Sequence, residues 1–190
     1  MLRHTHHVLG FNARPTLLPL IIILALASGH PAGAALLLTE IHYNGPTAGS
    51  DPDEFLELSN NGPAQLSLSG HRFTSGVALA FAAGVELPAW QSIVLVRDKH
   101  GFSDSFPAFT GRLFEFGGAL SNSGETLTLS NSTGTPLWSV HYDDGGAWPA
   151  SADGGGSSLQ LLPGGVADPG DAGSWFGGTP TPGIWDGFPI

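Results

Sequence analysis

Acidic side chains interrupt the first apolar stretches of the sequence, and they are the residues with the clearest capacity for chemistry. Glu40 lies inside LLLTEIHY, Glu54 and Glu57 belong to EFLELS, and Asp51 and Asp53 lie in the loop between the two stretches. Glutamate is depleted in β-strands, so these carboxylates either face water, accept N–H bonds from a neighbouring loop, or bind a cation. Calcium takes about six to eight oxygen ligands, which this region contains, but no glycine stands at the sixth loop position that an EF-hand requires.

Histidines, serines and glycine-rich loops give weaker indications of a metal-binding or catalytic site. The histidines after residue 34 show none of the spacings HxH, HxxxH or HExxH that are typical of metal sites; they are His42, His71, His100 and His141. Cysteine is absent, there is no GxSxG nucleophile motif, and Gly154–Ser157 lacks the lysine of a P-loop. The sequence therefore predicts no catalytic, cofactor-binding or metal-binding residue and no enzyme activity.

Short strands joined by turns must position these side chains. The chain contains 28 glycines and 15 prolines, which disfavour long helices. Alternating apolar and polar residues between turn signals predict about seven to nine short strands, and thus an all-β, immunoglobulin-like sandwich. The predicted strands include Leu36–Tyr43, Phe55–Ser59, Ser92–Val96 and Glu125–Asn131, with a further hairpin strand at Val77–Phe81. One helical turn is expected within 97–106.

The sequence divides into three segments. Residues 1–34 are predicted to be a signal peptide, residues 35–162 the β-sandwich domain, and residues 163–190 an irregular Gly/Pro-rich tail. The aromatic residues of this tail, Trp175, Phe176 and Trp185, are candidates for packing against the sandwich.

The N-terminal segment has the pattern of an export signal. Arg3 and Arg14 precede the apolar run Leu17–Ala27, and a small-x-small site, Ala32-Gly33-Ala34, follows. The run is shorter than the ~20 residues of a membrane span, so we expect cleavage after Ala34, with cleavage after Ala27 or an uncleaved anchor as alternatives. The sequence thus predicts a secreted, periplasmic or cell-surface protein with no membrane span after cleavage.

Charge excludes some classes of partner. The formal net charge is −10, and it becomes −12 after signal removal because two of the six Lys and Arg lie before residue 35 while all 16 acids lie after it. Such a surface repels the phosphates of nucleic acids and anionic membranes. We expect an unidentified protein or extracellular polymer as partner, and no nucleic acid.

Several segments of the sequence, in their order and approximate spacing, resemble the lamin tail domain as it occurs in bacterial secreted proteins. They are TEIHYN at 39–44, DEFLELSN at 53–60, LSLSGHRFTSG at 66–76, LVRD at 95–98, LSNSGETLTL at 120–129 and WPASADGGGSSLQL at 148–161. The closing TPTPG at 179–183 is similar to the TPG that often follows that domain. The resemblance implies an immunoglobulin-like sandwich that carries Glu40 and Glu57 at family positions. It also implies an accessory module, found beside secreted hydrolases, that binds or tethers and does not catalyse.

The residues and the resemblance together predict a secreted or cell-surface, non-catalytic interaction module. The first alternative is a calcium-assisted protein that binds a carbohydrate or a surface, with the cation near Asp51–Glu57 and exposed Trp90 or Trp148 as sugar platforms. A hydrolase is the remaining alternative. Trp138 alternates with Val140 in its strand, so we expect it in the core.

Overall fold

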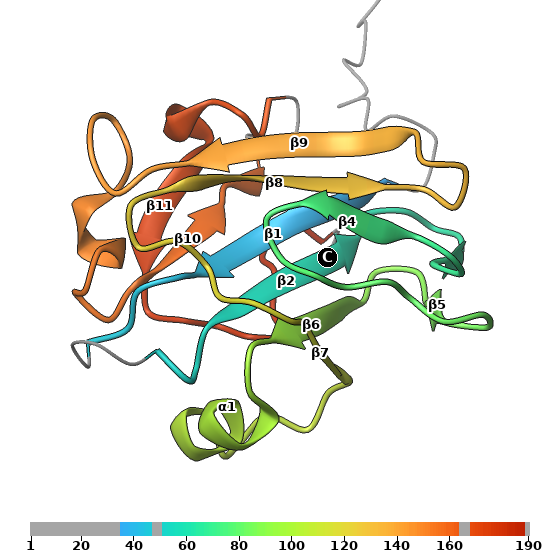
Figure 1. Ribbon diagram of the computed structural model, residues 1–190, viewed down its shortest axis with the longest axis horizontal. Coiled ribbons are helices and arrows are strands. Elements are labelled where there is room, and N and C mark those ends of the chain that lie inside the picture. Colours follow the sequence, from blue (N-terminus) through green and yellow to red (C-terminus); the bar gives the residue numbers. More distant parts are fainter. Residues whose placement is uncertain (1–34, 47–50, 164–167, 189–190) are drawn as a thin grey trace, which may run out of the picture. The chain divides into compact units, whose positions relative to one another are not determined.

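The computed structural model describes residues 35–46, 51–163 and 168–188. The predicted signal peptide, residues 1–34, lies outside the described residues. Two β-sheets face each other across an apolar core, which confirms the predicted all-β sandwich (Figure 1). Among the described residues, no helix is both long and apolar enough to cross a membrane.

The larger sheet has six strands in the order β11-β10-β1-β2-β6-β7. Their bounds are β1 Leu36–His42, β2 Phe55–Asn60, β6 Ser92–Val96, β7 Leu113–Glu115, β10 Ser158–Leu161 and β11 Trp175–Gly178. The pairings are antiparallel except between β6 and β7, which run parallel because the helix α1, Lys99–Ser105, connects them as a crossover. The register of β1 against β2 shifts between Leu38 and Glu40, so that Thr39 forms a bulge. Every residue of β2 is buried, so both faces of the sheet centre are covered.

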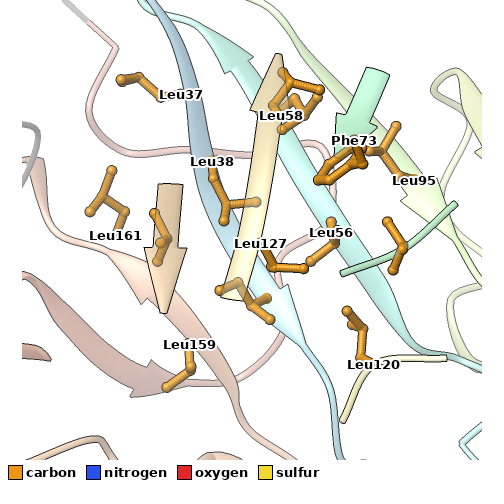
Figure 2. Close-up of a cluster of buried hydrophobic side chains, with 14 of the residues drawn as sticks. Leu37, Leu38, Leu56, Leu58, Phe73, Leu95, Leu120, Leu127, Leu159 and Leu161 are labelled. Carbon is orange, nitrogen blue, oxygen red and sulfur yellow. The ribbon is translucent and has the colours of Figure 1, made fainter. Parts of the chain in front are cut away.

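The smaller sheet has three antiparallel strands in the order β4-β8-β9. They are β4 Arg72–Ser75, β8 Glu125–Ser130 and β9 Pro136–Tyr142, and the two-residue strands β3 Leu66–Ser67 and β5 Glu86–Leu87 pair beside them. Leu127 from β8 and Phe73 from β4 meet Leu56 and Leu58 from β2 in the space between the sheets (Figure 2). Alternation along β2 therefore turns Glu57 to the opposite face of the large sheet, away from this core.

A second apolar cluster lies under the helix. Phe102 of α1 is fully buried against Phe55, Val94 and Val96. Asp98 caps the helix because its side chain accepts bonds from the backbone N–H groups of His100 and Gly101. The helix is longer than the single turn expected, because this cap and the burial of Phe102 stabilise it.

The structure corrects three details of the predicted fold. The described residues contain eleven strands, more than the seven to nine expected, because the two-residue strand β5 and the late strand β11 carry little sequence signal. Val77–Phe81 is not a continuous strand; isolated bridges pair Ala80 with Arg72 and Ala78 with Gly117 there. Much of the segment after residue 162 is irregular, but β11 extends the large sheet from within it.

Candidate functional site

Glu40 and Glu57 lie opposite each other on β1 and β2 and form a buried polar cluster. The register pairs the two residues directly, and their side chains are only 1% and 0% exposed. Of the alternatives considered for these acids, exposure to water is therefore excluded for Glu40 and Glu57. Among the described residues neither carboxylate has a Lys, Arg or His partner, so hydrogen bonds alone compensate for their burial.

Glu40 is held by donors from β10 and from the C-terminal segment. Its Oε1 accepts bonds from Ser158 Oγ, from Gln160 Nε2 at 3.3 Å and from the backbone N–H of Thr181 at 2.9 Å. The hydroxyl of Thr181 lies 3.4 Å from Oε2. Burial raises the pKa of Glu40 to about 7, helped by the nearby charge of Glu57 and opposed by these hydrogen bonds.

Glu57 is held in the same way by its own strand neighbours and by the same C-terminal segment. Thr39 Oγ1 donates to Oε1 at 2.6 Å, and Ser59 Oγ donates to it at 3.3 Å. The backbone N–H of Gly183 donates to Oε2 at 2.6 Å. Burial raises the pKa of Glu57, while these bonds oppose the shift.

The segment that meets both carboxylates is a tight turn. The N–H of Ile184 donates to the carbonyl of Thr181 at 2.9 Å, with Pro182 second and Gly183 third in the turn. Gly183 has φ +86°, so proline followed by a glycine of positive φ matches a type II turn. We call the two carboxylates together with residues 181–184 the carboxylate–turn cluster.

Side chains beside the turn fix the rest of the C-terminal segment. Gln160 Nε2 donates to the carbonyl of Thr179 at 2.6 Å, and Trp185 Nε1 donates to the carbonyl of Leu161 at 3.0 Å. Trp185 is 6% exposed and belongs to the main core cluster. The closing TPTPG is thus part of the folded domain.

The acids of the loop before β2 point to separate partners. Asp51 accepts the N–H of Gly45 at 2.9 Å and the amide of Asn122 at 3.2 Å. Asp53 lies 3.8 Å from His42 Nε2, and hydrogen bonding to this imidazole is the main cause that lowers the pKa of Asp53. These contacts fix the loop to neighbouring elements.

Glu54 is the third acid of the loop before β2, and it also has protein partners. Its Oε1 accepts Arg97 Nη1 at 2.9 Å, and its Oε2 accepts the N–H of Leu120 at 2.8 Å. Burial is the main cause that raises the pKa of Glu54, opposed by Arg97 and the Leu120 bond. Within the described ranges, no three His, Asp or Glu side chains lie close enough together to hold a metal ion.

The remaining histidines and tryptophans are dispersed. His42 is buried between Phe55 and Phe106, whereas His100 and His141 are exposed. Trp138 is half-buried and packs edge-on against Phe73 with ring centroids 5.9 Å apart, in line with its expected core position.

The two tryptophans considered as sugar platforms have aromatic neighbours. Trp148 lies 6.2 Å from Trp175, and Trp90 lies 6.5 Å from Phe188, as centroid distances. Both tryptophans are half-buried.

The described residues enclose a larger and a smaller surface hollow. One of about 470 Å³ lies between the start of β1, β3 and β9, and its walls are apolar except for Ser67 and His71. The other, of about 260 Å³, lies beside the carboxylate–turn cluster. The first hollow brings together no pair of titratable side chains of the kind that acid–base catalysis uses.

Sequence reasoning foresaw N–H bonds to Glu40 and Glu57 from a neighbouring loop, but it did not identify the donors. The donors stand more than 120 residues later, in a segment that was expected to be an irregular tail. The Pro-Gly pair inside TPTPG was the available signal, because it marks a type II turn whose N–H groups need acceptors.

The comparison with protein families agrees with this architecture. The model of the Lamin Tail Domain family matches residues 30–144, more than half of the chain. None of the curated proteins matches. The chain belongs to the lamin tail domain family, whose members are immunoglobulin-like and generally non-enzymatic modules.

Proposed function

We propose that this lamin tail domain protein is exported and works in the periplasm, at the cell surface or outside the cell as a non-catalytic interaction module. Export is supported by the charged, apolar and small-residue pattern of residues 1–34. The partner is a protein or an extracellular polymer that the domain binds or tethers.

One observation carries the non-catalytic part of the proposal. The buried acids that chemistry would require are all engaged in bonds that hold the fold: Glu40 and Glu57 bind the C-terminal turn, and Glu54 binds Arg97 and the Leu120 N–H. A general acid or base needs a side chain free to reach substrate. Glu40 has a pKa suited to acid–base work, but its carboxylate is occupied by protein donors.

We also propose that the domain functions without a bound metal ion. Asp51, Asp53 and Glu54 each have different protein partners, which supports a loop held by hydrogen bonds and an ion pair. Calcium-assisted binding would instead require these oxygens to converge on one cation.

The experiment that tests the function is affinity capture from the source organism. The immobilised chain is incubated with the envelope and culture-fluid fractions, and bound material is identified after crosslinking. We expect a saturable partner that survives EDTA. Turnover of ester, phosphodiester or glycoside substrates by the purified chain, at a rate that Glu40→Gln abolishes, would overturn the proposal.

A further inference from the structure

The smaller hollow combines an apolar rim with acidic groups. It has a volume of about 260 Å³ and lies between the end of β10, β11 and the C-terminal segment. Leu162, Phe176 and Ile184 line it and are 38%, 40% and 64% exposed. Glu40 and Asp186 line it as well.

The apolar residues are gathered, not scattered. In the part of the chain that the structure describes, the large apolar side chains with high exposure are these three and Leu137 on β9. Three of the four therefore surround one hollow. Single exposed apolar residues are ordinary, but a group of them around a concavity marks a site of interaction.

The charge of the hollow indicates what kind of group it accepts. Its titratable lining residues are the acids Glu40 and Asp186, and Glu57 lies behind Glu40 on the neighbouring strand. The described Lys and Arg residues do not line it; they are Arg72, Arg97, Lys99 and Arg112. Glu40 is only 1% exposed and its carboxylate is held by protein donors, so the exposed carboxylate of Asp186 is the lining charge that can meet a ligand. With no Lys or Arg among the lining residues, this carboxylate attracts a cationic group and repels an anionic one.

We propose that this hollow is the docking site for a partner-protein segment in which an apolar side chain is flanked by basic side chains. The apolar side chain covers Phe176 and Ile184, and the basic side chains lie toward Asp186. This inference rests on the proposed function, because it names the surface and the partner chemistry that an interaction module of this kind would use.

Short model peptides test the chemistry directly. The probes are acetyl-Leu-Lys-Phe-Lys-Leu-amide, the same peptide with Glu in place of Lys, and acetyl-Gly-Lys-Gly-Lys-Gly-amide. Each is titrated into the full chain labelled with ¹⁵N, and amide and indole shifts are followed. We expect the basic apolar peptide to shift residues of β10, β11 and the C-terminal segment, Trp185 included, with an affinity of about 1 mM or tighter.

The two other peptides separate the contribution of charge to the affinity from the contribution of apolar contact. The acidic peptide and the glycine peptide should each bind about tenfold more weakly, because one loses the charge attraction and the other the apolar contact. Raising the salt from about 0.05 M to 0.5 M should weaken the basic peptide selectively. Equal binding of the acidic peptide, or shifts confined to other surfaces, would overturn the proposal.

Substitutions of exposed apolar side chains inside and outside the smaller hollow test whether the peptide binds there. Ile184→Ser and Phe176→Ser should each weaken the basic apolar peptide about tenfold, whereas Leu137→Ser on β9 removes an exposed apolar side chain elsewhere and should leave the affinity unchanged. Asp186→Asn should reduce the preference for the basic over the acidic peptide. Unchanged melting temperatures show that the variants fold.

Affinity capture distinguishes failure of this inference from failure of the proposed function. If Ile184→Ser captures the same partner as the unmodified chain, the docking site is wrong while the module still binds. If neither chain captures a partner, the interaction function itself fails.

Discussion

At the scale of single residues, the central feature is a pair of buried carboxylates that have no Lys, Arg or His partner among the described residues. Glu40 and Glu57 lie side by side on β1 and β2, and hydroxyl, amide and backbone N–H donors surround them. Burying a carboxylate is costly unless hydrogen bonds replace its water. Two of these bonds come from the backbone of one turn, at Thr181 and Gly183, so the same residues that satisfy the carboxylates also fix the end of the domain.

Glu40 makes stability depend on pH near neutrality. Its pKa is about 7 in the folded chain against 4.5 ordinarily, so the folded state favours the protonated form. This contribution is full below about pH 4.5 and is lost as the pH rises through about 7, a difference of about 3 kcal/mol. Burial also raises the pKa of Glu57, which adds to the effect with the same sign.

Glu40→Gln should remove most of this dependence. The amide keeps an oxygen for the Ser158, Gln160 and Thr181 donors, and its NH₂ can donate to the Thr181 hydroxyl. Urea unfolding at pH 5, 7 and 9 should show that the variant exceeds the parent chain in stability at pH 9 but not at pH 5. A difference that stays constant across this range would contradict the assigned ionisation.

Gly183→Ala tests the turn. A Cβ at this position would force a side chain into φ +86° and would lie 2.9 Å from the Phe109 ring, so we expect a loss of about 2 kcal/mol. Gly84→Ala is the matched control, because Gly84 has φ +82° with no atom within 4 Å of the added Cβ. Its loss, measured by urea unfolding, should be about 1 kcal/mol. Equal losses would mean that the turn is not packed as described.

At the scale of elements, the last segment of the chain acts as a cover for one face of the large sheet. β11 pairs with β10 along Trp175–Gly178, and the chain then crosses to the carboxylates of β1 and β2. Trp185 anchors this path, since its ring belongs to the main core and its N–H binds the carbonyl of Leu161. The domain therefore continues at least to this tryptophan.

Trp185→Ala should lower the free energy of unfolding by about 3 to 5 kcal/mol, because it removes a buried ring and its hydrogen bond. The neighbouring Ile184→Ala is the control. Its side chain is 64% exposed, and the change should cost less than about 0.5 kcal/mol. Chemical denaturation followed by circular dichroism measures both, and similar small losses for the two variants would contradict the anchoring role of Trp185.

The strands that were predicted correctly are those whose own residues show an alternating or continuously apolar pattern. Strands such as β2, β6 and β8 alternate or run apolar between clear turns, so their positions follow from their own residues. β11 could not be predicted this way, because WFGG has no period and depends on the edge of β10 for its hydrogen bonds. The donors to Glu40 and Glu57 were missed for the same reason, since they are brought close only by the completed sheet.

At the scale of the whole molecule, the chain is an acidic β-sandwich of the lamin tail domain family whose conspicuous acids are used internally. What remains for partners is its surface. There, the hollow rimmed by Leu162, Phe176 and Ile184 combines apolar contact with negative charge.

Chelation tests the metal-free part of the account. A ligand that binds only the native state raises the melting temperature by mass action. We expect the melting temperature in excess EDTA to match that in about 1 mM calcium chloride, to within about 1 °C. A rise of several degrees with calcium, lost in Asp51→Asn, would support the calcium-assisted alternative.

Amide hydrogen exchange at Thr181 and Gly183 reports on the carboxylate–turn cluster itself, because these two N–H groups donate to Glu40 and Glu57. Bonded and buried amides exchange only when the structure opens, whereas free ones exchange at the rate of an unfolded peptide. We predict that both amides are protected to the same degree as those of β10, and that Glu57→Ala removes the protection of Gly183 while the strands stay protected. Exchange of both amides at the unfolded rate in the unmodified chain would contradict the account.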